Sequence, residues 1–145
     1  SNDRRGEITA LKSQITTAGA PAPAGAYSQG IVAGDFVFIA GQGPGDPKTG
    51  VVPEGIEAQT HLVLRNIEAI LAAADTTLDQ VVKVTAHLSN LSNFKAFNSA
   101  YREHFSDPLP VRTTVGSALL GILVEIDVVA YRGQLSSPID IPTKN

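Results

Sequence analysis

The sequence of 145 residues contains no cysteine, no methionine and no tryptophan. Without cysteine the chain forms no disulfide, binds no zinc or iron–sulfur cluster through thiolates and offers no cysteine nucleophile. The three histidines (His61, His87 and His104) lie at no spacing typical of metal ligands, so each is interpreted as a surface or hydrogen-bonded residue. We therefore expect no metal centre.

Charged residues are also scarce. They make up 17% of the chain, below the usual value of about 25%. Eleven basic and fourteen acidic side chains give a net charge of -3, which does not favour nucleic-acid binding. A small domain with so little charge has difficulty covering its surface with polar groups. We expect that part of this surface is buried against other copies of the chain, the alternative being a surface rich in glycine, alanine and serine.

Long hydrophobic runs are absent as well. Runs such as Phe36–Ala40 and Ala69–Ala74 fall far short of the roughly 20 residues that a membrane span needs. The first seven residues contain no apolar segment typical of a signal peptide, so we expect a cytoplasmic protein with no membrane partner. The length is that of one domain (residues 1–145), with a core over about residues 8–132 between a polar N-terminal end and a C-terminal tail that contains serine and proline.

Alternation of apolar and polar residues predicts six strands: Lys12–Thr17, Tyr27–Val32, Phe36–Ala40, Val81–Leu88, Val111–Val115 and Leu123–Tyr131. The third is apolar on both faces, which is typical of an interior strand. In the fourth, one face is apolar (Val82, Val84, Ala86 and Leu88). The other face is mixed (Val81, Lys83, Thr85 and His87), and we expect another copy of the chain to cover it.

Spacings of three and four residues predict two helices. The first carries an apolar face over Ile56–Ala74, and the second carries a stripe of Phe94, Asn98, Tyr101 and Phe105. The predicted order is β-β-β-α-β-α-β-β. It indicates an α+β domain in which both helices pack on one face of a mixed sheet.

Two polar side chains in strands, Glu125 and Arg112, are candidates for chemistry. Glu125 and Asp127 share a strand face with large apolar residues, although they could equally be ordinary acids on a solvent-facing strand. Arg112 could bind a substrate carboxylate through two parallel hydrogen bonds. Alternatively, it could form a structural salt bridge with Glu125 or Asp127.

Asn98 is a third candidate, because it interrupts the apolar stripe of its helix. A buried amide must form hydrogen bonds, so Asn98 either caps a loop or helps to shape a site. Other motifs are incomplete. Residues 26–30 lack the first glycine of a nucleophile elbow, and the glycine-rich segment 41–45 matches no dinucleotide-binding or phosphate-binding loop.

Several segments, taken in order along residues 12–131, resemble the YjgF/Rid family of reactive intermediate deaminases, also described as endoribonuclease L-PSP-like proteins. These segments are Gly25–Gly30, Ala40–Gln42 with Asp46–Gly50, Asn98 with Tyr101, Pro110–Val115 and Val124–Ile126. The resemblance implies a chorismate-mutase-like fold that assembles as a homotrimer with sites in the clefts between subunits. It also implies hydrolysis of 2-imino or 2-enamino acids to 2-oxo acids and ammonia, without metal or cofactor.

By position, the resemblance implies that Arg112 grips the substrate carboxylate and that Glu125 orients the hydrolytic water. Tyr27, Gly41, Asn98 and Thr114 match positions that line the cleft. This agrees with elementary chemistry, because an imine is already electrophilic and requires only a held carboxylate and a placed water.

The chain departs from the family pattern in three places. Ala40 stands where many relatives have serine, and Thr114 stands where many have cysteine. The segment between Arg112 and Glu125 is shorter than in many deaminases, and its loop, residues 116–121, carries no charge. The altered loop favours an alternative substrate, such as an aminomuconate-like or aminoacrylate-like compound. A non-catalytic ligand-binding trimer is a further alternative, and a ribonuclease is the least favoured.

Overall fold

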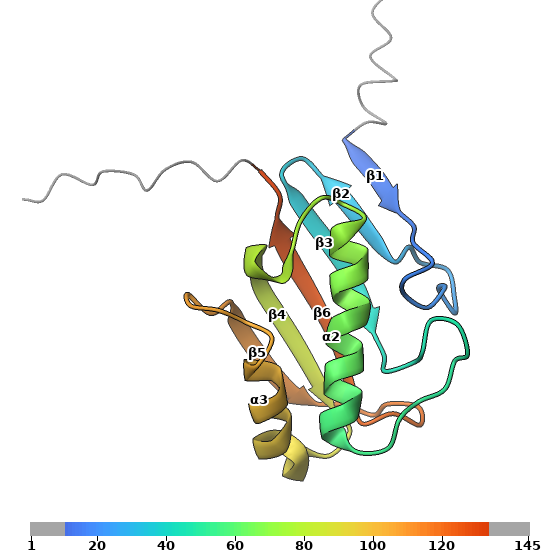
Figure 1. Cartoon of the computed structure of the whole chain (residues 1–145), viewed down its shortest axis with the longest axis vertical. Coiled ribbons are helices and arrows are strands. Elements are labelled where there is room, and N and C mark those ends of the chain that lie inside the picture. Colours follow the sequence, from blue (N-terminus) through green and yellow to red (C-terminus); the bar gives the residue numbers. More distant parts are fainter. Residues whose placement is uncertain (1–10, 134–145) are drawn as a thin grey trace, which may run out of the picture.

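A computed structural model describes residues 11–133 of the chain, which form one mixed sheet of six strands with two helices on one face (Figure 1). The α+β class and the predicted order of the elements are confirmed. The strands are β1 (Lys12–Ile15), β2 (Gly30–Ala33), β3 (Phe36–Gln42), β4 (Val81–Leu88), β5 (Val111–Gly116) and β6 (Val124–Tyr131). The helices are α2 (Ile56–Ala72) and α3 (Phe94–Arg102), and short 3₁₀ turns precede β4 and α3 at Leu78–Gln80 and Leu91–Asn93. The polar end predicted before residue 8 and the C-terminal tail after Gly133 lie outside the described residues.

The strands lie in the spatial order β1-β2-β3-β6-β4-β5. All neighbours are antiparallel except β4 and β5, which run parallel because the chain crosses over through α3 between them. The last strand, β6, therefore inserts into the middle of the sheet between β3 and β4. This places Glu125 of β6 beside β3 on one side and β4 on the other.

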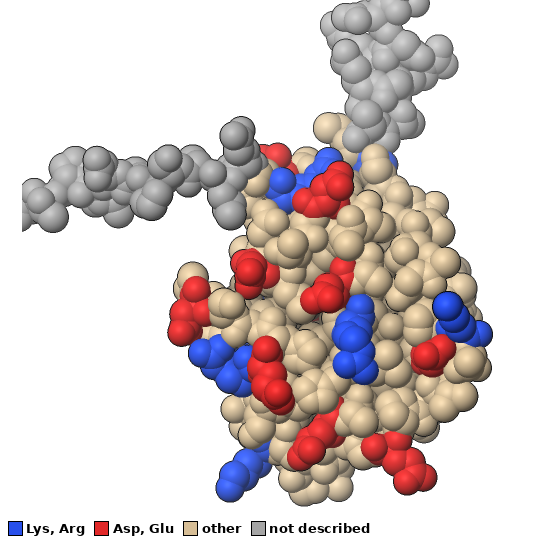
Figure 2. All heavy atoms as spheres, viewed as in Figure 1, with Lys and Arg blue, Asp and Glu red and all other residues tan. Residues whose placement is uncertain are grey.

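The core lies between α2, α3 and the sheet face that they cover. Val63, Leu64, Ile67 and Ile70 of α2 are completely buried, as the helical period predicts. They pack against the inward side chains of β3, β4 and β6. Each such side chain contributes roughly 1.5–3 kcal/mol of hydrophobic stabilisation. The outward surface of the helix layer carries acidic and basic groups interspersed among uncharged residues (Figure 2).

The first half of β4 differs from the predicted alternation. A register shift between Val81 and Lys83 makes the two of them face consecutive residues of β6, which leaves Val82 as an extra residue in a β-bulge. Val81 is consequently buried, whereas Val82 is 43% exposed. The prediction that Val82 belongs to the apolar face was therefore wrong. The predicted apolar face is confirmed for Val84, Ala86 and Leu88, which follow the bulge.

The buried stripe of α3 is also rotated relative to the prediction. Phe97, Ala100 and Tyr101 are buried, whereas Asn98 is exposed and Phe94 is 42% exposed. The prediction that Asn98 lies on the buried stripe was wrong, because α3 turns Phe97 and Tyr101 into the core and leaves Asn98 beside Arg112 at the surface.

The predicted strand Tyr27–Val32 begins only at Gly30. Before it, the backbone N–H of Tyr27 donates to the carbonyl of Gly25 in a local turn. The buried amide of Gln29 accepts a hydrogen bond from the backbone N–H of Thr17 and donates to the carbonyls of Thr17, Ala20 and Pro21. These bonds satisfy the backbone of the Pro-rich loop and hold residues 17–29 as a closed loop. Tyr27 therefore lies in a loop, where it is half exposed.

The sheet face opposite the helices is open in the single chain. Strand β3 is an interior strand as predicted, yet Phe36 and Phe38 are 44% and 47% exposed on this face. Val111 of β5 is exposed as well. Burial of β3 on both faces is thus not achieved within one chain. Within residues 11–133, no helix is long and apolar enough to cross a membrane.

Candidate functional site

Arg112 lies on β5 and is paired with Val84 of the parallel strand β4. Val84 is fully buried on the sheet face that the helices cover, so Arg112 faces α3. Its guanidinium carbon lies 4.5 Å from the ring centroid of Tyr101, 5.4 Å from that of Phe97 and 5.7 Å from that of Phe94. Rings within about 6 Å attract a cation through their electron-rich faces. Three aromatic side chains of one helix therefore hold the guanidinium against α3.

Asn98 completes this arrangement. Its Oδ1 accepts a hydrogen bond of 2.8 Å from Nη2 of Arg112, which fixes the rotation of the guanidinium plane. A guanidinium carries five N–H donors in a rigid fork, so one bond to an amide leaves donors available. Beside it lies a cavity of about 280 Å³, lined by Asn98, Tyr101, Arg102, Leu109, Pro110 and Arg112. The cavity has the donor chemistry to bind a carboxylate.

Tyr101 contributes a polar group that the apolar pattern of α3 does not reveal. Its hydroxyl is buried and has no hydrogen-bond partner among residues 11–133. Burial raises the pKa of Tyr101, and the positive charge of Arg112 opposes part of this rise. A buried hydroxyl without a partner at the wall of a cavity is a donor that a ligand could satisfy. The apolar spacing of α3 alone predicts Tyr101 as a core residue.

Thr114 lies two residues beyond Arg112 on the same face of β5, opposite the buried Ala86. It is half-buried on the side of the sheet that the helices cover. We call Asn98, Tyr101, Arg112 and Thr114 the arginine half-site. The structure thus brings together three of the residues predicted from the sequence.

Glu125 lies on the opposite face of the sheet, together with its cross-strand neighbour His87. Its carboxylate leans toward β3, where it covers the backbone of Gly41. A Cβ atom added at Gly41 would lie 2.8 Å from Oε2 of Glu125, which is closer than real Cβ contacts allow. Glycine at this position therefore leaves the space that the carboxylate occupies.

Tyr27 and Gly41 line one cavity of about 230 Å³ at the ends of β2 and β3. The ring of Tyr27 is 50% exposed, and its hydroxyl accepts a hydrogen bond of 3.1 Å from the backbone N–H of Ala24. Gly41 borders this cavity and also lies beside the carboxylate of Glu125. We call Tyr27, Gly41 and Glu125 the glutamate half-site.

The two half-sites do not meet within one chain. Arg112 faces the helices, Glu125 faces the open side, and β4 lies between their strands. The two side chains form no salt bridge with each other, and Arg112 forms none with Asp127. The interpretation of Arg112 as a structural partner of either acid is therefore wrong for the single chain. Its hydrogen-bond partner is Asn98.

A second polar network lies on the open face beside Glu125. Nδ1 of His87 lies 2.9 Å from Oγ of Ser117, and Nε2 lies 3.5 Å from Oδ2 of Asp127. The backbone N–H of Ser117 also donates to the carbonyl of Leu88. Asp127 is thus not simply a solvent-facing acid. The network anchors the start of the loop that joins β5 to β6.

The other two histidines also contact each other. Nδ1 of His61 on α2 lies 2.7 Å from Nε2 of His104 after α3, and Nε2 of His61 lies 3.7 Å from Oε2 of Glu103. Burial lowers the pKa of His104, and the adjacent His61 lowers it further. Both are satisfied histidines, as expected. Within residues 11–133, no group of three histidine or acidic side chains is arranged to hold a metal ion.

The chain matches the family model described as Endoribonuclease L-PSP over residues 17–132. It is 46% identical over 125 residues to a RutC family protein of Pyrococcus horikoshii, with 84% of this chain and 99% of the relative covered. It is 36% identical over 127 residues to the 2-iminobutanoate/2-iminopropanoate deaminase of Salmonella typhimurium, with 84% and 99% covered. The crystal structure of RidA from the Antarctic bacterium Psychrobacter is similar with a TM-score of 0.79 at 40% identity, with 82% and 98% covered.

Proposed function

The chain belongs to the YjgF/Rid family, which includes imine deaminases, and we propose that it is itself a hydrolytic deaminase of reactive 2-imino and 2-enamino acids. Its products are the 2-oxo acid and ammonia. The observation that carries this proposal is the arginine half-site. It holds a guanidinium beside a small cavity, with its plane fixed by Asn98 and by aromatic rings.

In this proposal Arg112 binds the carboxylate of the substrate. A planar guanidinium matches a carboxylate through two parallel hydrogen bonds, which fixes both the position and the orientation of the substrate. Thr114 and the buried hydroxyl of Tyr101 lie on the same side of the sheet as Arg112 and supply further polar groups. The imine carbon, one bond from the carboxylate, is then held at a defined place.

Glu125 acts in the chemical step. Its carboxylate accepts a hydrogen bond from a water molecule and directs the water oxygen toward the imine carbon. The new C–O bond forms while the C=N electron pair moves to nitrogen. The protons of the water pass to that nitrogen, the C–N bond breaks and ammonia leaves. Water is the only co-reactant, so the hydrolysis requires no redox or group-transfer cofactor.

The proposed site needs two chains. Because the half-sites lie on opposite faces, Arg112 of one subunit meets Glu125 of a neighbouring subunit only in an oligomer. The apolar side chains on the open sheet face, Phe36 and Phe38 among them, supply a surface for this contact. The resemblance to the family implies three subunits, so we propose a homotrimer with its sites in the clefts between subunits.

The proposal is tested by measuring release of 2-oxo acid from freshly generated 2-iminobutanoate. We expect Arg112→Lys to lose roughly 10- to 150-fold in kcat/KM, because lysine keeps the charge but not the two-pronged geometry. We expect Glu125→Gln to lower kcat with less effect on KM, because its role lies in the chemical step. The matched control is Arg132→Lys, an exposed arginine outside both half-sites. A folded Arg112→Lys protein with the wild-type rate would rule out the assignment.

A further inference from the structure

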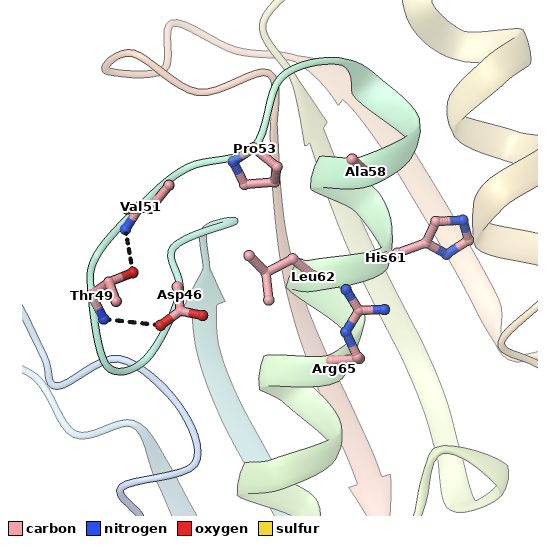
Figure 3. Close-up of a pocket in the computed structure, with 8 residues that line it drawn as sticks. All are labelled: Asp46, Thr49, Val51, Pro53, Ala58, His61, Leu62 and Arg65. Atoms are coloured by element: carbon pink, nitrogen blue, oxygen red, sulfur yellow. Dashed lines mark hydrogen bonds between the residues drawn. The ribbon is translucent and has the colours of Figure 1, made fainter.

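A groove unrelated to either half-site runs along the outer side of α2. It has a volume of about 630 Å³, within the range of small-molecule sites. Its lining residues come from the loop before α2 and from the exposed side of that helix (Figure 3): Asp46, Thr49, Val51, Pro53, Ala58, His61, Leu62 and Arg65. None of them belongs to the arginine or the glutamate half-site.

The loop wall of this groove is held in place by hydrogen bonds to α2. The amide of Asn66, buried in the helix, donates to the carbonyls of Gly43 and Gly45. The amide of Gln59 donates to the carbonyl of Pro53. Both ends of the loop are therefore tied to the helix. The groove is formed before any ligand arrives, which reduces the ordering that binding requires.

Two groups of opposite charge, Asp46 and Arg65, line the groove. Oδ1 of Asp46 accepts hydrogen bonds from the backbone N–H groups of Lys48 and Thr49, while its other oxygen points toward α2 (Figure 3). The hydrogen bond from Thr49 lowers the pKa of Asp46 most, and the bond from Lys48 lowers it further. The carboxylate therefore stays charged. Arg65 projects from the helix on the other side, with Leu62 between the two (Figure 3). Within residues 11–133, neither charge forms an ion pair.

The remaining cationic candidate at the groove is already engaged. The ring of His61 points toward α3, where one nitrogen meets His104 and the other lies near Glu103 (Figure 3). Arg65 is therefore the cation that a ligand in the groove would meet. Apolar side chains of Val51, Pro53 and Leu62 form the surface between the two charged groups.

We propose that this groove binds a small zwitterion, with its ammonium group toward Asp46, its carboxylate toward Arg65 and its apolar segment on Leu62, Val51 and Pro53. A ligand with one charge can pair with only one of these two groups, whereas a zwitterion can pair with both. The site is separate from the proposed deaminase centre and does not depend on it.

The test is a nuclear magnetic resonance titration of the ¹⁵N-labelled full chain. The probes are 6-aminohexanoate and its two single-charge analogues, hexanoate and hexylamine. We expect saturable shifts of the amides of residues 46–53 and 58–65, with 6-aminohexanoate binding several-fold more tightly than either analogue. Absence of saturable shifts there, or equal affinity for hexanoate or hexylamine, would overturn the proposal. The titration is repeated in Arg112→Lys, so that shifts arising at the arginine half-site are recognised by their loss.

Two variants separate the charges. Arg65→Gln and Asp46→Asn should each weaken binding of 6-aminohexanoate roughly 10-fold or more, because each removes a charge-assisted hydrogen bond. Asparagine keeps an oxygen that can accept from Lys48 and Thr49, so the loop is retained, which the amide spectrum verifies. Arg132→Gln is the matched control and should bind normally. Normal binding by Asp46→Asn with an intact loop would refute the zwitterion assignment.

Discussion

Gly41 is the residue at which one added methyl group has the clearest consequence. The Cβ of alanine would lie 2.8 Å from Oε2 of Glu125, so the half-buried carboxylate must move away from its present position. We expect Gly41→Ala to lower kcat for 2-iminobutanoate about 10-fold or more, because misplacing a catalytic group by about 1 Å has effects of this size. The free energy of unfolding should change little, since the glutamate side chain can rotate.

The matched variant for this comparison is Gly45→Ala. Its added Cβ would make an ordinary contact of 3.8 Å with Cγ of Pro21 and none with Glu125. Both variants are assayed for 2-oxo acid release and for thermal unfolding. Equal kcat values for the two would show that the position of Glu125 does not depend on Gly41.

At the residue scale, the sequence predicts which side chains are unusual better than it predicts their partners. The period of two places Glu125 on the face opposite the core, and this is what the structure has. The contact with Gly41 joins residues far apart in the chain, so no local pattern could reveal it. The same holds for Arg112 and Asn98, whose hydrogen bond depends on how α3 packs against β5.

At the element scale, the start of the loop between β5 and β6 is anchored by the side chain of His87. His87 contacts Ser117 at the start of the loop and Asp127 on β6. We expect His87→Leu to reduce the free energy of unfolding by about 1 kcal/mol, the typical net contribution of a hydrogen bond. Amide hydrogen exchange over residues 118–121 should become faster. Calorimetry and exchange measured by mass spectrometry provide the two readouts.

The conservative variant His87→Asn serves as the control, because its amide can still reach Ser117 from the position of Nδ1. It should restore protection of the loop more fully than leucine. Unchanged exchange over residues 118–121 in His87→Leu would mean that the backbone bond from Ser117 to Leu88 alone holds the loop.

Elements were predicted correctly in type and order because their apolar periods are strong, as in α2. The errors have specific physical causes. The bulge at Val82 shifts the alternation of β4 by one residue, and bulges depend on the pairing of two strands rather than on one sequence. The late start of β2 follows a local turn, in which the backbone N–H of Tyr27 donates to the carbonyl of Gly25 and not to a neighbouring strand.

At the scale of the whole molecule, two features are incomplete in a single chain, and assembly with further copies of the chain would complete both. Its open sheet face exposes Phe36 and Phe38, and its two half-sites lie on opposite faces. The low fraction of charged residues points in the same direction and was visible in the composition alone. The division of the site was not visible there, because the alternation in residues 111–115 does not reveal which face of that strand turns toward the helices. The central claim is therefore that Arg112 and Glu125 act together from different subunits.

The most direct test is subunit complementation. Arg112→Lys and Glu125→Gln chains, each with low activity alone, are mixed in equal amounts under conditions that exchange subunits, and exchange is verified by mass. If each site takes its arginine from one subunit and its glutamate from the next, random mixing gives both native residues to about one quarter of the sites. The account predicts recovery of about that fraction of wild-type hydrolysis of 2-iminobutanoate. No recovery in verified mixed oligomers would contradict it.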